Sequence, residues 1–331
     1  MSKTRITRIA EVSIFFIAFF LLIRSIYIAA STFAPDFSVM WGGARGLLMN
    51  RNPYTESGLF TGIGYPPNSL IFYIPLALLP YKVAQGVFMS LSALSIFGVV
   101  LLLFKIIKDS KGISLLLAFS LIVFSFPTRF TLGMGQNNLI ALLLLLFSYY
   151  LYKGKQKVGA GIMLGLAISF KTIFIFFLLF FLLRKQWKIL ATSVLTIILV
   201  VLSTMAIFGD YLYVYYIKNV VPPLMNLAGR EIYYNQGLVG FIARLTSDFY
   251  IRRYLSLAGS FGLFYLLFKF RKTKNINLYF SMFIVALLLI DTLSWQHHFV
   301  WLIFPFVIIF GELFKRKLKM LYLVLATAYL L

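Results

Sequence analysis

Two acidic side chains stand in the first long polar break of a very apolar sequence. Residues 31–68 are rich in Gly, Pro and Tyr and contain Trp41, and they hold Asp36 and Glu56, two of the nine acids in the chain. An ionised Asp36 could accept a proton from a hydroxyl group as a general base. An Asp between a loop and an apolar stretch is equally favoured as a helix N-cap. The local pattern therefore leaves a base and a structural cap as alternatives, with Glu56 as the reserve acid.

A lysine lies at the junction of two apolar segments. Lys171 follows residues 158–170 and precedes residues 172–183, with no acid near it in sequence. At membrane depth a lysine is costly unless its ammonium group reaches water, an anion or a polar partner. We expect Lys171 either to bind an anion or to snorkel to the membrane surface.

Amide side chains gather between two other apolar segments. Residues 133–138 read GMGQNN and end in Gln136, Asn137 and Asn138. Glycines permit tight backbone turns. Amides can bind sugar hydroxyls or cap the next helix, and capping alone would need only one of the three.

Polar turns and aromatic residues recur late in the chain. Residues 233–237 (YYNQG) precede a short amphipathic segment that contains Arg244. Trp295 stands before His297 and His298, and Trp is common as an anchor at the membrane interface. Adjacent side chains on a helix project about 100° apart, so we expect only one of the two histidines in a site. No spacing of His, Asp and Glu requires a metal ion, although a divalent metal stays open.

The composition predicts the scaffold that must position these residues. The 331 residues are 61% hydrophobic and 12% charged, whereas soluble domains are about 45–50% apolar and about 25% charged. This composition indicates an all-α polytopic membrane protein. The net charge of +22 does not favour nucleic-acid binding, because the basic residues form short clusters between apolar runs. Cysteine is absent, which excludes disulfides.

The basic clusters predict the topology. Six clusters, near residues 3–8, 105–111, 153–157, 184–188, 269–274 and 315–319, hold most of the 31 Lys and Arg residues. Cytoplasmic loops carry such an excess, so the chain must leave and return between clusters. About 11 transmembrane or partial segments fit, with a cytoplasmic N-terminus and a first segment retained rather than cleaved: 9–30, 84–104, 113–126, 139–152, 158–170, 172–183, 189–208, 254–268, 277–293, 298–310 and 318–331.

Some of these segments are too short to cross a bilayer on their own. Residues 158–170 and 172–183 would meet below the outer surface, with Lys171 at the floor of an outward-facing cavity. Residues 69–80 are bounded by prolines, and we expect a re-entrant or interfacial hairpin there. The whole chain, residues 1–331, then forms one domain with two long extracytoplasmic loops, 31–83 and 209–253.

The order of motifs resembles a known family. The sequence is similar to glycosyltransferase family 87 of the GT-C superfamily through Asp36 and through N-P-Y (52–54), Y-P-P (65–67), G-Q-N-N (135–138), G-x-x-L-G-L-A-x-x-x-K (161–171), R-x-x-W (184–187), N-Q-x-L-x-G (235–240) and S-W-x-H-H (294–298). Each motif is weak alone, and together they cover most of the chain. Two features depart from the family pattern: no Pro follows Lys171 closely, and Gly237 stands where Ser is common.

The resemblance implies a multi-pass enzyme of the cell envelope with an extracytoplasmic active site. Such an enzyme moves a hexose, by analogy mannose, from a polyprenyl phosphate to a hydroxyl of a lipid or glycan acceptor, with arabinofuranose as a second sugar and no cofactor. Asp36 would be the catalytic base, and the donor phosphate would contact Lys171, Arg129 and Arg244. The sugar or acceptor would contact Glu56, Tyr65, Gln136, Asn137, Asn235, Trp295 and His298.

Two other classes remain as alternatives. A transporter or lipid flippase predicts inverted repeats and charges near the middle of the bilayer, whereas the polar residues here gather at the predicted outer ends of the segments. A non-catalytic assembly subunit would not need Asp36.

Overall fold

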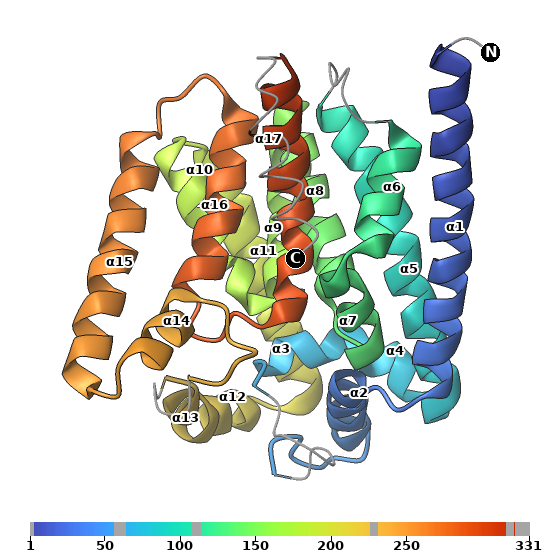
Figure 1. The fold of residues 1–331 in the computed structure, drawn as a ribbon. Coiled ribbons are helices and arrows are strands. Elements are labelled where there is room, and N and C mark those ends of the chain that lie inside the picture. Colours follow the sequence, from blue (N-terminus) through green and yellow to red (C-terminus); the bar gives the residue numbers. More distant parts are fainter. Residues whose placement is uncertain (1–2, 56–63, 108–113, 226–230, 316–320, 322–331) are drawn as a thin grey trace. The chain divides into compact units, whose positions relative to one another are not determined.

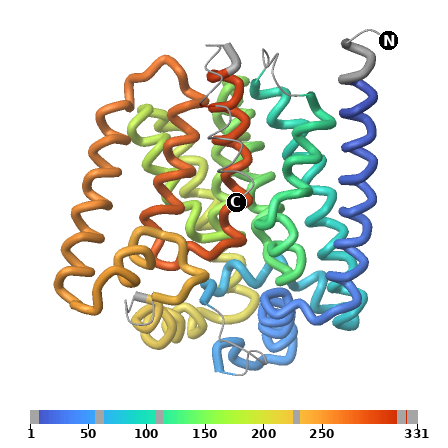
Figure 2. The backbone as a smooth tube through the Cα atoms, in the orientation of Figure 1, coloured from blue at the N-terminus to red at the C-terminus, as the bar shows by residue number. Residues whose placement is uncertain are grey.

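The computed structural model describes residues 3–55, 64–107, 114–225, 231–315 and 321 (Figures 1 and 2). The chain divides into two compact units, each built from separate stretches of sequence. Unit 1 comprises Met1–Ser25, Ala93–Thr131 and Gly229–Leu331, and unit 2 comprises Ile26–Ser92 and Leu132–Ala228. Helices account for the regular structure of the described residues, and one isolated bridge joins Asn235 to Trp295.

Three helices contribute residues to both units, namely α1 (Lys3–Ser31), α5 (Tyr81–Ile106) and α7 (Phe126–Met134). The other elements of unit 2 are α2 (Pro35–Leu48), α3 (Pro67–Leu70), η1 (Ile71–Tyr73), α4 (Ile74–Ala77), α8 (Asn138–Lys153), α9 (Lys157–Phe170), η2 (Thr172–Ile175), α10 (Phe176–Leu183), α11 (Trp187–Phe208), α12 (Tyr211–Tyr215), η3 (Tyr216–Val220) and α13 (Val221–Met225). Those of unit 1 are α6 (Leu115–Phe124), α14 (Leu238–Leu245), α15 (Phe249–Lys269), α16 (Ile276–Ile290), η4 (Gln296–Leu302) and α17 (Ile303–Lys315).

The predicted apolar segments up to residue 310 all contain helix, which bears out the all-α fold. Among the described residues, four helices are long and apolar enough to cross a membrane: Arg8–Ser31, Tyr81–Ile106, Trp187–Phe208 and Gln296–Leu313. α6 and α7 form a further candidate, bent by 60° at Ser125. The count of eleven segments stays a prediction, and residues 318–331 lie largely outside the described residues.

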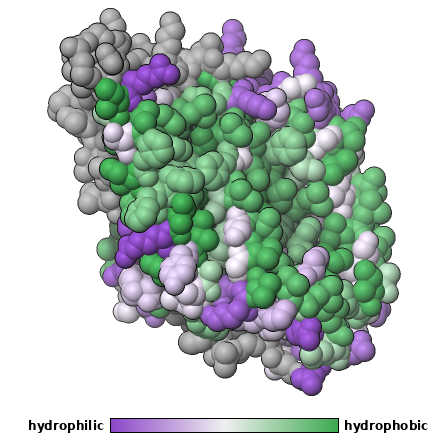
Figure 3. Space-filling view, turned by 90° about the vertical axis from the view of Figure 1, so that its right-hand side faces the viewer, coloured by the Kyte–Doolittle hydropathy of each residue, from purple (hydrophilic) through white to green (hydrophobic). Residues whose placement is uncertain are grey.

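The surface of α1 is typical of a helix that faces lipid. Phe16 and Phe20 are 63% and 67% exposed, and only 17% of the most apolar window of this helix is buried. Figure 3 views the side on which α1 lies, where hydrophobic side chains cover most of the surface and hydrophilic ones gather near its upper and lower margins. Such exposed apolar surface favours a multi-pass membrane protein.

The core of unit 2 rests on three adjacent helices. α9 packs against both α8 and α11 (Figure 1). A Cβ atom added at Gly161 or Gly165 of α9 would collide with Thr192 or Thr196 of α11. Small residues allow two helix backbones to approach closely. The glycines therefore fix α9, and with it the residue that follows, Lys171.

The two predicted outer loops contain short helices rather than irregular chain. Residues 69–80 do not form a hairpin, because α3, η1 and α4 succeed one another as short helical turns. Pro67 and Pro75 each stand in a first helical turn, where the missing N–H is tolerated. Leu70, Tyr73 and Ala77 are buried, so this segment packs into the core of unit 2.

An aromatic cluster supports the beginning of α2. Phe37 stacks on Phe88 of α5, with 4.9 Å between ring centroids, and Phe88 contacts Tyr73 of η1 at 5.7 Å. Tyr73 also stacks on Phe170 at the end of α9, at 5.9 Å. These rings join the residue after Asp36 to the residue before Lys171 within one packed core.

Candidate functional site

Asp36 lies in the first turn of α2 and does not cap it. The N-cap is Ala34, whose extended backbone leads into Pro35 at the first helical position. Because proline begins the helix, Asp36 comes too late for the cap position, and the N-cap alternative is wrong. Its carboxylate instead accepts a hydrogen bond from the side chain of Gln136, with Nε2 2.8 Å from Oδ2.

Burial raises the pKa of the Asp36 carboxyl above its usual value, because the surrounding protein disfavours the charge. The hydrogen bond from Gln136 and the positive charge of Lys171 lower this pKa and offset part of the effect. A carboxylate with a raised pKa is a better proton acceptor than a free one once it is ionised.

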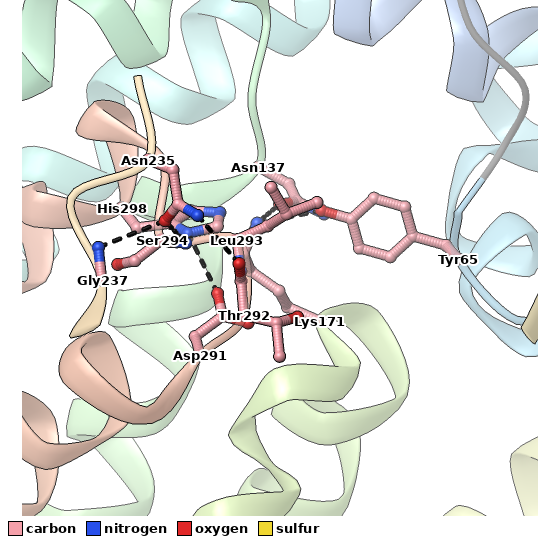
Figure 4. A network of polar contacts seen from close by, with 10 residues as sticks. All are labelled: Tyr65, Asn137, Lys171, Asn235, Gly237, Asp291, Thr292, Leu293, Ser294 and His298. Atoms are coloured by element: carbon pink, nitrogen blue, oxygen red, sulfur yellow. Dashed lines mark hydrogen bonds and ion pairs between the residues drawn. The ribbon is translucent and has the colours of Figure 1, made fainter. Parts of the chain in front are cut away.

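Lys171 is buried between α9 and η2. Its backbone is extended, with φ −140° and ψ 95°, and the residue is only 2% exposed. Its Nζ donates hydrogen bonds to the hydroxyl of Tyr65, at 2.9 Å, and to Oδ1 of Asn137, at 3.0 Å (Figure 4). An ammonium held in this way does not snorkel to a surface, so the snorkelling alternative is wrong.

The G-Q-N-N motif forms the tight turn between α7 and α8. Gly135 has φ +71°, and a Cβ atom there would lie 2.6 Å from Cβ of Phe37. Asn137 occupies the N-cap position of α8 but makes no side-chain capping bond. Its Nδ2 donates to the carbonyl oxygen of Phe170 at 3.4 Å. The capping alternative therefore fails for Asn137, whose amide is directed at the end of α9.

The N-terminal motifs converge on the same part of unit 2. The hydroxyl of Tyr54 donates to the carbonyl oxygen of Tyr65 at 3.0 Å. Asn68 and Ser69, at the start of α3, donate to the carbonyl oxygen of Ser169 at 3.3 Å and 2.8 Å. These bonds tie Tyr54 to Tyr65 and the start of α3 to the end of α9, where the Tyr65 ring lies beside Lys171.

Tyr73 is a member of this cluster that the sequence analysis missed. It is buried, it hydrogen-bonds with Asn137, and burial raises its pKa well above the usual value. Asp36 and Tyr65 lie close enough to affect that pKa as well. A lone Tyr in the apolar run of residues 70–79 gives no sequence signal of this role.

In unit 1, Asn235 joins the two late motifs. Its Oδ1 accepts hydrogen bonds from the backbone N–H groups of Gly237, at 3.2 Å, and Ser294, at 3.1 Å. Its Nδ2 donates to the carbonyl oxygen of Thr292 at 2.9 Å (Figure 4). Asn235 is fully buried, so the geometry assigns its amide to the backbone.

The histidines of the S-W-x-H-H motif are buried in unit 1. Nδ1 of His298 lies 3.8 Å from a carboxylate oxygen of Asp291, and the ring of His298 stacks on Trp301 at 5.0 Å. The planes of the His297 and His298 rings stand at 85° to one another, with 4.7 Å between ring centroids. Trp295 stacks on His297 and contacts Tyr234, so it is more than an interface anchor.

The remaining predicted site residues belong to unit 1 or fall outside the described residues. Arg129 is an exposed residue of α7. Arg244, on α14, donates to the carbonyl oxygens of Asn235, at 2.7 Å, and Ile232, at 3.4 Å, and so supports the turn before its own helix. Glu56 falls among residues 56–63, outside the described residues.

Unit 2 thus brings Asp36, Tyr65, Gln136, Asn137 and Lys171 together, with Tyr73 in addition. A carboxylate and an ammonium held by neutral polar groups can take up a proton and bind an anion. Among the residues that the structure describes, no group of three or more His, Asp or Glu side chains could hold a metal ion.

The chain is similar to proteins of known activity. It is 24% identical over 254 residues to alpha-(1->3)-arabinofuranosyltransferases of two Mycobacterium tuberculosis strains, CDC 1551 / Oshkosh and ATCC 25618 / H37Rv. The match covers 73% of this chain and 57% of each relative, so the chain spans little more than half the length of these relatives. No solved structure matches it significantly. The model of glycosyltransferase family 87 matches residues 60–294, and since this range covers most of the sequence, the chain belongs to that family.

Proposed function

We propose that this protein is a membrane glycosyltransferase that moves a sugar from a polyprenyl phosphate to an acceptor hydroxyl. The single observation that carries the proposal is that one polar cluster of unit 2 holds both a half-buried carboxylate, Asp36, and a buried ammonium, Lys171, close enough for the lysine charge to act on the carboxyl. Membership of glycosyltransferase family 87 supports the same reaction class.

The proposed reaction needs a proton acceptor and a cation. The acceptor oxygen bonds to the anomeric carbon of the sugar while the bond from that carbon to the phosphate oxygen breaks. The electron pair of the broken bond stays on the phosphate, which leaves as polyprenyl phosphate. Asp36 takes the proton of the acceptor hydroxyl, a step worth about 10²–10⁴-fold in rate.

Lys171 is the proposed partner of the donor phosphate. As the sugar leaves, the phosphate gains negative charge, and an ammonium group held in place stabilises that charge. Tyr65 and Asn137 fix the ammonium group without changing its charge. The leaving group is already a good one, so the proposal requires neither a general acid nor a metal ion.

The depth of Lys171 suits a lipid-linked donor. α9 has 14 residues, and at 1.5 Å per residue it is about 21 Å long. Its first residue, Lys157, belongs to a basic cluster that we expect at the cytoplasmic surface. Lys171 would then lie about two thirds of the way through a hydrocarbon core of about 30 Å, nearer the extracytoplasmic side.

Two sugars are candidates for the donor. Resemblance to the family predicted a hexose, with mannose first. The names of the mycobacterial relatives favour arabinofuranose as the second candidate. The sugar must therefore be tested rather than assumed, and the acceptor with it.

A transfer assay tests the proposal. Purified protein is incubated with radiolabelled polyprenyl-phosphate mannose or polyprenyl-phosphate arabinofuranose, together with octyl glycosides as acceptors. We expect a labelled octyl product with one of the two donors, at an unchanged rate in EDTA. Absence of product with both donors, together with movement of the donor across the bilayer of reconstituted vesicles, would favour the flippase alternative instead.

A further inference from the structure

Two adjacent amides in unit 2 are directed at the two charged groups of the proposed reaction. Gln136 contacts the Asp36 carboxylate, and the next residue, Asn137, contacts the Lys171 ammonium. We propose that Gln136 and Asn137 are positioning residues, which hold the base and the phosphate-binding cation at a fixed separation. This inference rests on the proposed function and reassigns two side chains that the sequence analysis had given to sugar or acceptor binding.

Gln136 orients the carboxylate of Asp36. Its amide nitrogen donates to Oδ2 at 2.8 Å. A carboxylate offers two oxygens, and a donor on one of them fixes the plane of the group and the direction of the other. The second oxygen, Oδ1, can then receive the proton of an acceptor hydroxyl. Gln136 itself is half-buried, so its amide lies at the edge of the core.

Asn137 orients the ammonium group of Lys171 in the same way. Its Nδ2 donates to the carbonyl oxygen of Phe170, which determines that its Oδ1 faces Lys171. Both ends of this buried amide are already bonded, Nδ2 to the Phe170 carbonyl oxygen and Oδ1 to the Lys171 ammonium, which favours a positioning role over a sugar contact. The amide connects the end of α9 to the turn that begins α8.

The backbone conformation of Gly135 fixes the position of both amides, and we call Gln136 and Asn137 together the amide bracket. Gly135 precedes them with φ +71°, a conformation that favours glycine. A Cβ atom there would lie 3.0 Å from Cβ of Ala34 and 2.6 Å from Cβ of Phe37, on both sides of Asp36 in sequence. The turn therefore lies directly against the start of α2.

The amide bracket would keep the base and the cation in the geometry that the proposed reaction needs. Reaction requires the acceptor oxygen and the sugar phosphate to be in line, and errors of about 1 Å can cost about 10²-fold in rate. Amides are uncharged at every working pH, so they set positions without altering the charges of the base or the cation. A carboxylate or a basic side chain at position 136 or 137 would instead alter the charge balance around the base and the cation.

A pair of substitutions separates the two positioning roles. Gln136→Leu removes the donor to Asp36 and should lower kcat by about 10-fold or more, with the donor KM unchanged. Asn137→Leu removes the acceptor for Lys171 and should raise the donor KM several-fold. Gln156→Leu, at an exposed glutamine before α9, is the matched control and should change neither quantity.

The pH profile provides the readout that a merely structural role would not change. Gln136 and Lys171 both act on Asp36 and lower the pKa of its carboxyl. Tyr73 also lies close to Asp36, whose charge raises the pKa of the tyrosine hydroxyl. Without the Gln136 bond the pKa of Asp36 rises. Because the base must be ionised, the midpoint of the acidic limb of the kcat profile should move to higher pH in Gln136→Leu. The decrease in kcat relative to the parent protein should become smaller as pH rises.

A second variant preserves the test if Gln136→Leu fails to fold. Gln136→Glu keeps the shape and places a like charge beside Asp36, so the acidic limb should move further toward high pH. If both variants fold and the acidic limb of the kcat profile does not move, the positioning role is overturned. The same holds if kcat falls by the same factor at every pH. If Asp36→Asn is inactive in the same assay, only this inference fails; if Asp36→Asn is active, the proposed base itself is wrong.

Discussion

The polar clusters of the two units use their side chains in different ways. In unit 2, Gln136 and Asn137 are bonded to ionisable side chains, those of Asp36 and Lys171. In unit 1, the side chain of Asn235 is bonded to the backbone of Gly237, Thr292 and Ser294. The amide of Asn235 holds a loop together, whereas the amides that contact Asp36 and Lys171 hold the charged groups of the proposed reaction. Both clusters come from polar motifs of similar strength in the sequence, and only the partners distinguish them.

The largest effect should come from Asp36. Asp36→Asn keeps the size of the side chain and removes the ability to take a proton, so kcat should fall by about 10²-fold or more. Rates in the transfer assay, with donor binding measured separately, give the test. Asp210→Asn, at an exposed aspartate of unit 2, is the matched control. Near-normal turnover of Asp36→Asn would transfer the role of base to another acid, with Glu56 first.

Lys171 should give the second largest effect. Lys171→Met retains the length of the side chain and removes the charge, so the apparent donor KM should rise at least several-fold while the protein folds. Titration of polyprenyl phosphate against the purified variant measures the same loss without catalysis. Lys157→Met, at an exposed lysine at the other end of α9, should bind normally. Equal binding by both variants would show that Lys171 has only a structural part.

Asn235 should give the smallest effect on turnover and a clear effect on stability. Asn235→Ala leaves buried backbone donors and acceptors unsatisfied, each at about 1–3 kcal/mol. We expect a lower thermal unfolding temperature in detergent, with nearly normal kcat for the molecules that remain folded. Asn219→Ala, at an exposed position, should unfold like the parent protein. A large loss of kcat without loss of stability would place Asn235 with the reacting residues instead.

The helices could be predicted from sequence because their apolar stretches are bounded by basic clusters and polar turns. The segment from Pro67 to Ala77 could not, since its helical pieces of three or four residues are too short to show a period. The motifs named five of the six residues of the unit 2 cluster, Tyr73 being the exception, but not the hydrogen bonds between them. Lys171 and Tyr65 are 106 residues apart, and Asp36 and Gln136 are 100 apart. Nothing local distinguishes the amide of Asn137 from that of Asn235.

The contact between α9 and α11 has a mechanical consequence. Gly161 and Gly165 lie so close to Thr192 and Thr196 that α9 cannot accept a larger residue there without separating the helices. Two helices that interlock in this way resist sliding along their axes. Lys171 directly follows α9. The distance of its ammonium group from the start of α9 therefore depends on the length of the helix, and the glycine contacts keep the helix from shifting along α11. The two glycines thus fix the position of α9 along α11, and the length of α9 then fixes the position of Lys171.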